Sequence, residues 1–209
     1  MTVKRQTQIR KIPFFDELLE TVADPQQKDY LESFKTKLDF ARYYLDNYED
    51  GVKKYNTSLS EHDITLIVKA NAEAFIFVVK SALDCLANFL NKRFILPMDK
   101  VYFNDELQSK LAEDNGGEEE NLKYKISCLI AEFLKDNDYL FKLRNLVTHN
   151  TVMKADYALN LSESIISVSF QEIDDDANAP TDRKVDSYCK EVIERLYRLS
   201  GRIFEEIVT

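Results

Sequence analysis

The chain has no tryptophan, few glycines, prolines and cysteines, and no long hydrophobic run. Its longest apolar run covers only Ala74 to Val79, whereas a membrane-spanning helix needs about 20 apolar residues. The basic N-terminus is not followed by an apolar segment, so we expect neither a signal peptide nor a transmembrane helix. With 4 glycines and 4 prolines among 209 residues, the composition also excludes collagen-like and low-complexity chains.

Cysteine and histidine are too scarce for the common metal and disulfide frameworks. The three cysteines are far apart and form no C-x-x-C pair: Cys85, Cys128 and Cys189. This pattern argues against a disulfide framework or a zinc site and predicts a reducing, cytoplasmic location. With only His62 and His149, one chain cannot build a His-rich metal site. Glycine-rich nucleotide loops and the hydrolase elbow motif are also missing, and we expect no metal and no cofactor.

Positive charge is the other shortage, because 37 acidic residues outweigh 28 lysines and arginines and give a net charge of -9. Such a balance argues against broad, non-specific nucleic-acid binding, although it leaves room for a local basic site. Hydrophobic residues make up 44% of the chain, which is ample for a core. A chain of this length should bury about 70% of its extended surface.

Most of the chain has the apolar periodicity of helices. Asp24 and Pro25 match the N-cap and first position of a long helix, whose apolar stripe is Leu31, Phe34, Leu38, Ala41, Leu45, Tyr48 and Val52. A second helix is predicted over Glu61–Phe94, apolar on most of its circumference. Such a helix is either central in its own domain or covered on one side by a partner subunit. Further helices are predicted near Leu107 and Leu111, over Glu119–Lys135, and over Tyr139–His149.

After His149, apolar and polar residues alternate with a period of two. This alternation predicts a β-hairpin with strands around Met153–Leu161 and Ile166–Phe170. An acidic loop, Glu172–Pro180, and a last amphipathic helix from about Thr181 follow. We therefore expect a mainly α protein, a helical bundle with a β-hairpin inserted before the C-terminal helix. Residues 1–209 are expected to form a single domain, divided into the bundle (24–150), the hairpin and acidic loop (151–180) and the last helix (181–209).

The helix over Tyr139–His149 carries the strongest candidate site. At about 100° per residue, Leu140, Leu143, Leu146 and Val147 form its apolar stripe. Arg144, Asn145, Thr148 and His149 lie on the opposite side. The Cα directions of Arg144 and His149 differ by about 140°, so this pair would work better with help from a second copy of the chain.

These residue types suit one reaction in particular, the cleavage of an RNA phosphodiester by its own 2′-hydroxyl group. His149 would accept the 2′-hydroxyl proton, and Arg144 would stabilise the pentavalent phosphorane. Asn145 would fix the imidazole tautomer or orient the guanidinium, whose planar fork matches phosphate oxygens. No metal is needed for this chemistry. An arginine and a histidine five positions apart on a solvent face also arise by chance, which leaves a purely structural helical protein as an alternative.

Arg144-Asn145-(x3)-His149 resembles the R-x4-6-H motif of the HEPN superfamily (higher eukaryotes and prokaryotes nucleotide-binding domains), in which a polar residue follows the arginine. Segment Ser81–Asn91 is similar to the long early helix often seen in that family. The resemblance covers about Leu31–Asn150 as a pattern. It implies a HEPN-like helical bundle that forms homodimers, in which two such motifs face each other across one composite cleft.

Two functions follow from the resemblance. The first is a metal-independent endoribonuclease with catalytic residues Arg144, Asn145 and His149, acting in stress, as a toxin or in phage defence, with an antitoxin protein as a further expected partner. The second is a non-catalytic binding or scaffold module for a nucleotide or a protein, because some members of the family lack activity. Neither function involves a membrane.

Overall fold

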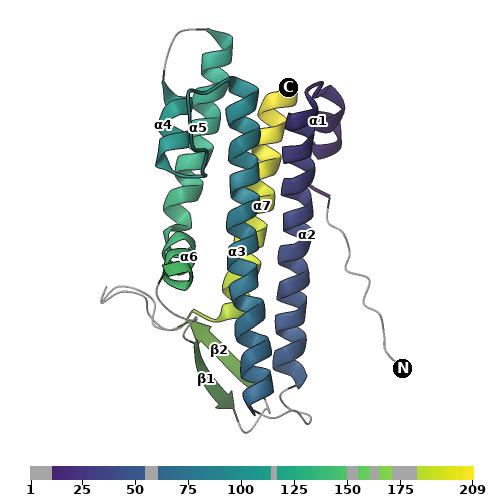
Figure 1. Cartoon of the computed structure of the whole chain (residues 1–209), viewed down its shortest axis with the longest axis vertical. Helices are drawn as coiled ribbons and strands as arrows, with labels where there is room; N and C mark the ends of the chain where they lie inside the picture. Colours follow the sequence, from purple (N-terminus) through teal and green to yellow (C-terminus); the bar gives the residue numbers. More distant parts are fainter. Residues whose placement is uncertain (1–10, 55–60, 114–116, 150–154, 161–164, 171–182) are drawn as a thin grey trace.

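The computed structural model describes the chain apart from six segments, and it is mainly helical (Figure 1). The described residues are 11–54, 61–113, 117–149, 155–160, 165–170 and 183–209. They form helices α1 (Phe15–Thr21), α2 (Pro25–Lys54), α3 (Glu61–Phe94), α4 (Asp105–Ala112), α5 (Glu118–Asp136), α6 (Asp138–His149) and α7 (Val185–Val208), with strands β1 (Ala155–Asn160) and β2 (Ile165–Phe170). The predicted mainly α fold is confirmed.

Helices α2 and α3 form the long antiparallel pair of the bundle (Figure 1). The predicted start of α2 is confirmed, because the Asp24 carboxylate accepts a hydrogen bond from the Gln26 N–H group at 2.9 Å. Of the predicted stripe on α2, only Val52 is partly rather than fully buried. The bounds of α3 agree with the predicted helix, but Phe77 in its apolar stretch is exposed.

The C-terminus of α3 has the hydrogen bonding of a Schellman motif. The Leu96 N–H group donates to the Asn91 carbonyl at 3.0 Å, and Ile95 between them has φ 51°. Glycine usually takes this left-handed position, because a β-branched side chain crowds the backbone there. Pro97 follows and prevents the helix from continuing.

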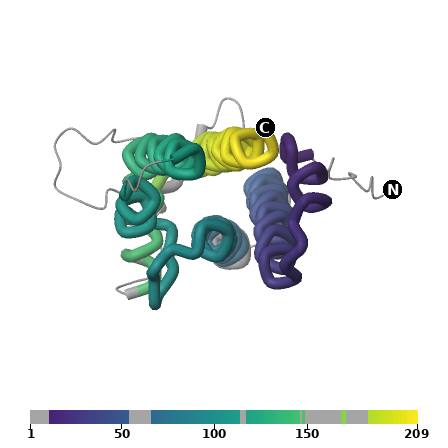
Figure 2. The backbone as a smooth tube through the Cα atoms, turned by 90° about the horizontal axis from the view of Figure 1, so that it is seen from above, coloured from purple at the N-terminus to yellow at the C-terminus, as the bar shows by residue number. Residues whose placement is uncertain are grey.

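Helices α2, α3, α7 and the α5–α6 column run alongside one another, and α4 packs on the outside of α5 (Figure 2). Helix α7 is the most amphipathic, and its apolar face is buried except for the partly buried Ile207; the face consists of Val185, Tyr188, Val192, Leu196, Leu199, Ile203 and Ile207. The described part of α7 begins at Val185, and the predicted start near Thr181 lies outside the described residues.

Helix α1 was not predicted, because it has fewer than two full turns and only two buried residues, Phe15 and Leu18. Phe15 packs against Phe204 of α7 with ring centroids 6.1 Å apart, and Phe34 of α2 meets the same ring edge-on at 6.1 Å. A three-helix aromatic contact thus fixes α1 to the bundle.

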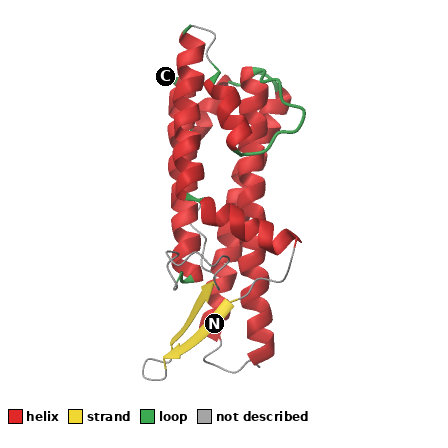
Figure 3. Cartoon of the chain, turned by 90° about the vertical axis from the view of Figure 1, so that its left-hand side faces the viewer, coloured by secondary structure: helices red, strands yellow, loops and turns green. Residues whose placement is uncertain are grey.

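The predicted hairpin is confirmed as an antiparallel pair that lies at one end of the bundle (Figure 3). Its register places Tyr157 opposite Val168 and Leu159 opposite Ile166. Edge-to-face ring contacts at 5.3–6.2 Å join β2 to two helices through Phe170, Tyr139 and Tyr188. The outer predicted residues Met153 and Leu161, the connecting turn and the acidic loop lie outside the described residues.

None of the helices in the described ranges is both long and apolar enough to cross a membrane.

Candidate functional site

Helix α6 divides into a buried and an open side, as its sequence predicts. Leu140 and Leu143 are fully buried, and Val147 packs partly against the core. On the other side Arg144 is half-buried, and Asn145 and Thr148 are exposed. The Leu146 side chain lies outside the described part of the structure. The helix therefore presents its polar residues away from the core.

Two of the three predicted catalytic residues contact each other. The Arg144 guanidinium donates a hydrogen bond to the Asn145 side-chain oxygen at 3.1 Å, and no carboxylate among the described residues pairs with Arg144. His149 is the last residue of α6 and lies one helical turn, about 6 Å, beyond Asn145. Its side chain lies outside the described part of the structure, so its distance to Arg144 stays a prediction.

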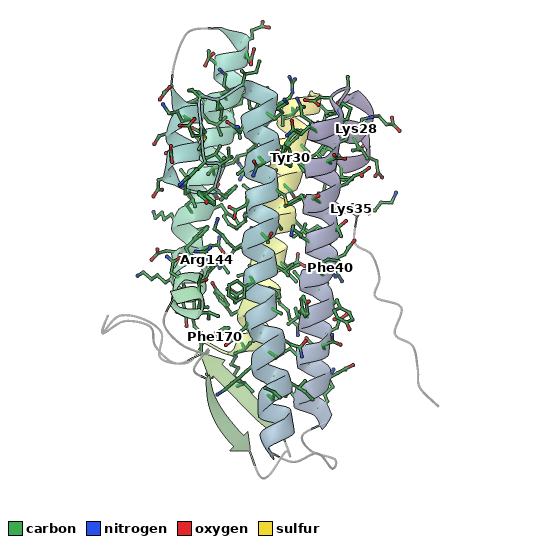
Figure 4. All side chains as sticks on the ribbon, in the orientation of Figure 1. Lys28, Tyr30, Lys35, Phe40, Arg144 and Phe170 are labelled. Carbon is green, nitrogen blue, oxygen red and sulfur yellow. The ribbon has the colours of Figure 1, made fainter. Side chains whose placement is uncertain are left out.

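Arg144 and Asn145 line an open cleft with a volume of about 860 Å³. This volume falls within the range of about 300–1,000 Å³ that small-molecule sites occupy. Figure 4 labels Arg144 beside α6, on the side toward α3. The cleft is lined by Lys80 of α3, by Tyr102, Phe103, Asn104 and Asp105 at the start of α4, by Ala131, Leu134 and Lys135 of α5, and by Asp138, Phe141, Arg144 and Asn145 of α6.

Lys80 is a member of this site that sequence reasoning missed. Its side chain is only 12% exposed and forms an ion pair with Asp84, one turn further along α3. The ammonium group lies 5.9 Å from the centre of the Tyr102 ring and 5.8 Å from that of the Phe141 ring. Because both rings attract the cation, they hold it at the cleft wall. A charged pair inside the most apolar stretch of the sequence was the signal that could have identified it.

The segment that carries Tyr102 is anchored on both sides. The Asp84 carboxylate accepts a hydrogen bond from the Phe103 N–H group at 3.0 Å, and the buried Phe103 ring meets Phe133 edge-on at 5.7 Å. The Asn104 side chain caps α4 by accepting from the Leu107 N–H group at 3.1 Å. The wall of the cleft opposite α6 is therefore a fixed structure.

The charges at the cleft nearly balance. Three cations, Lys80, Lys135 and Arg144, face the carboxylates of Asp105 and Asp138. Asp138 also pairs with Lys142 at 3.1 Å. Within a chain of net charge -9, a cleft near neutrality is the kind of local site that can accept an anion.

Two thiols of the described helices are not activated nucleophiles. Burial raises the pKa of the Cys85 thiol, and the neighbouring Asp84 carboxylate raises it further against the opposing effect of Lys37. Burial also raises the pKa of Cys189, which lies in the core. Since the thiolate is the reactive form, these two side chains stay inert near neutral pH.

Several tyrosines of α2 lie outside the cleft. Tyr48 is buried, Tyr44 is half-buried and Tyr43 is exposed on α2, whereas Tyr55 and the His62 side chain lie outside the described part of the chain. Among the described residues, no group of three or more metal-ligating side chains gathers in one place. Comparison of the chain with family models, curated proteins and solved structures found no match.

Proposed function

We propose that the protein is a metal-independent endoribonuclease of the HEPN type, which acts as a homodimer. The observation that carries the proposal is the position of Arg144. Its guanidinium lies on the wall of an open cleft, contacts Asn145 at 3.1 Å and has no carboxylate partner among the described residues. An arginine left without a carboxylate partner at a cleft is available to a phosphate group.

The reaction would be an in-line transesterification of RNA. The 2′-oxygen attacks the adjacent phosphorus while the bond from phosphorus to the 5′-oxygen breaks, which leaves a 2′,3′-cyclic phosphate and a 5′-hydroxyl end. His149 would accept the 2′-hydroxyl proton, and the departing 5′-oxygen would take up a proton from water. Arg144 would bind the charge that develops on the phosphorane oxygens. Asn145 would act as the positioning residue that orients the guanidinium.

A second copy of the chain solves a geometric difficulty. On one α6 helix the directions of Arg144 and His149 differ by about 140°, which a long arginine side chain closes only in part. If two α6 helices meet across a two-fold axis, Arg144 of one protomer serves His149 of the other. We include in this proposal the HEPN-like character of the bundle, a cytoplasmic site of action and a role in stress, as a toxin or in defence with an antitoxin partner.

The test is cleavage of mixed-sequence single-stranded RNA in EDTA, with the new ends analysed by mass spectrometry. Wild-type protein should give cyclic phosphate ends, and His149→Ala should lower the rate by about 10²–10⁴-fold. Equal cleavage by wild type and His149→Ala would refute the nuclease. Ligand-induced stabilisation without turnover would instead support a non-catalytic nucleotide-binding module.

Mixing two inactive variants tests the composite site. A dimer of one Arg144→Ala chain and one His149→Ala chain contains one complete site only if the two residues act across the interface. The mixture should therefore recover activity that neither variant has alone. Failure to recover, or a monomer by light scattering at micromolar concentration, would contradict the composite site.

A further inference from the structure

We propose that the cleft binds one nucleotide unit of a single-stranded RNA, with the base stacked on Tyr102 and its phosphate held by Arg144 and Lys135. The inference rests on the proposed function for its choice of RNA, and it adds a base-binding residue that lies about forty positions from the motif. It follows from the exposure of Tyr102, its anchoring and its neighbours.

Tyr102 is an aromatic side chain held in the open. It is 51% exposed, although the residue after it is buried and hydrogen-bonded to α3. Ordering an exposed ring in this way lowers the entropic cost of stacking on it. An aromatic ring fixed at the edge of a pocket is the usual platform for an unpaired base in single-stranded RNA.

The groups around Tyr102 complement the rest of a nucleotide. Lys80, held between the Tyr102 and Phe141 rings, places a positive charge close to the bound base. Arg144 on α6 and Lys135 on α5 supply two cations without acidic partners among the described residues, at the same cleft. The Asn104 and Asn145 side chains bring amide groups that can hydrogen-bond a base edge.

The size and charge of the cleft favour a single strand over a duplex. Recognition of duplex RNA extends over about 16 base pairs and relies on many phosphate contacts. Here the cleft is about 860 Å³ in volume, and two of its cations, Arg144 and Lys135, lack acidic partners among the described residues. It therefore suits one splayed nucleotide and its adjoining phosphate.

Binding is measured with a probe that cannot be cut, a 2′-O-methyl tetranucleotide, by calorimetry or fluorescence anisotropy. Tyr102→Ala should weaken binding by about 5- to 100-fold, the effect of losing one base–aromatic stack. Tyr102→Phe should bind like wild type, because stacking needs the ring and not the hydroxyl. The matched control is Tyr124→Ala on α5, which removes a tyrosine that is 59% exposed outside the cleft and should change nothing.

A second probe measures how much the base alone contributes to binding. This tetranucleotide lacks the base at the bound unit but keeps all its phosphates. Its affinity for wild type should be about as low as the affinity of Tyr102→Ala for the complete probe. Tyr102→Ala should not distinguish the two probes. Equal affinity of wild type and Tyr102→Ala for the complete probe would overturn the proposal. So would a Tyr102→Phe variant that binds as weakly as Tyr102→Ala.

These results separate the two proposals. Tyr102-dependent binding of the uncut probe together with no RNA cleavage would retain the nucleotide site and refute the nuclease. Cleavage that depends on His149, with probe binding indifferent to Tyr102, would retain the nuclease and refute the stacking site. Circular dichroism and thermal unfolding of Tyr102→Ala should match wild type, since the ring is largely exposed.

Discussion

The two sides of helix α3 use the same backbone for different purposes. The side toward α2 and α7 is closed by apolar residues, where aromatic rings from α1, α2 and α7 meet in the core. The side toward α4 and α6 stays open, and it holds a partly buried ion pair and the exposed Tyr102 ring beside a cleft. A well-packed side thus gives the rigidity that lets the other side keep charged groups in fixed positions.

The largest effect should come from opening the closed side. Phe204 is fully buried and contacts two other rings, so Phe204→Ala should lower the free energy of unfolding by about 3–5 kcal/mol. Urea denaturation measures this loss. Phe40→Ala is the control, because Phe40 is 52% exposed on α2 and points away from the bundle (Figure 4). Equal losses from the two variants would contradict the packing described for α7.

On the open side, substitution should change activity rather than stability. If the proposed nuclease is correct, Arg144→Ala should lower the cleavage rate by about 10²–10³-fold, which corresponds to about 2.7–4 kcal/mol. Arg144→Lys should recover only part of this loss, because a lysine lacks the planar fork. Arg198→Ala, which removes an exposed arginine of α7 far along the chain from the motif, is the control for charge. A change in melting temperature as large as that of Phe204→Ala would place Arg144 in the fold instead.

The sequence predicts the closed side well and the open side poorly. In α2, α3, α5 and α7, apolar residues recur every three or four positions. This spacing predicts which residues are buried, because each helix turns one side toward the core. The Arg144–Asn145 pair was predicted because both residues lie on one helix. The cleft as a whole was not predicted, because Lys80, Tyr102 and Lys135 come from three elements separated in the chain and no periodicity links them.

Helix α1 shows the same limit at smaller scale. Its two buried residues, Phe15 and Leu18, do not establish a period, and its position depends on contact with α7. Between α5 and α6, the Asn137 side chain donates to the Phe133 carbonyl at 2.8 Å, and its oxygen accepts from Arg195 of α7 at 3.3 Å. Both features depend on contacts with α7, which local sequence patterns do not record.

The third prediction concerns Asp84, which connects α3 to the segment before α4. This carboxylate accepts a hydrogen bond from the Phe103 N–H group and pairs with Lys80, so Asp84→Ala leaves a mostly buried ammonium group without its partner. We expect a loss of about 1–3 kcal/mol in unfolding free energy, measured by urea denaturation. Glu191→Ala breaks an exposed ion pair of the same spacing and should cost about 0.3–0.5 kcal/mol.

A double variant sharpens the interpretation of Asp84. Lys80→Met combined with Asp84→Ala should be more stable than Asp84→Ala alone, because it removes the unpaired charge. If the double variant is instead as unstable as the sum of both single changes, the two side chains do not interact in solution.

The fourth prediction follows from the buried Cys189 thiol. Burial raises its pKa above the ordinary value of 9.0, so the folded protein keeps the proton at pH values where the unfolded chain has lost it. The contribution of this thiol to the free energy of unfolding is fully present below pH 9 and declines as the pH rises, by up to about 1.4 kcal/mol per pH unit. Between pH 9 and 10, wild type should therefore lose more stability than Cys189→Ala, in which this proton is absent. Parallel curves for the two proteins would contradict the burial of this thiol.

The smallest effect on stability should come from Ile95, directly after the C-terminal end of α3. Its φ of 51° is costly for a β-branched residue, and its side chain is 89% exposed and contributes little burial. Ile95→Gly should relieve this strain and, after the greater flexibility of glycine in the unfolded chain is subtracted, raise stability by about 0.5–1 kcal/mol. Thermal unfolding should show an increase, with Ile95→Ala in between. Because Asp84 and Phe103 anchor the segment beyond Ile95, nucleotide binding should not change. If Ile95→Gly weakened binding of the tetranucleotide while raising the melting temperature, the position of Tyr102 would depend on the end of α3 rather than on Asp84.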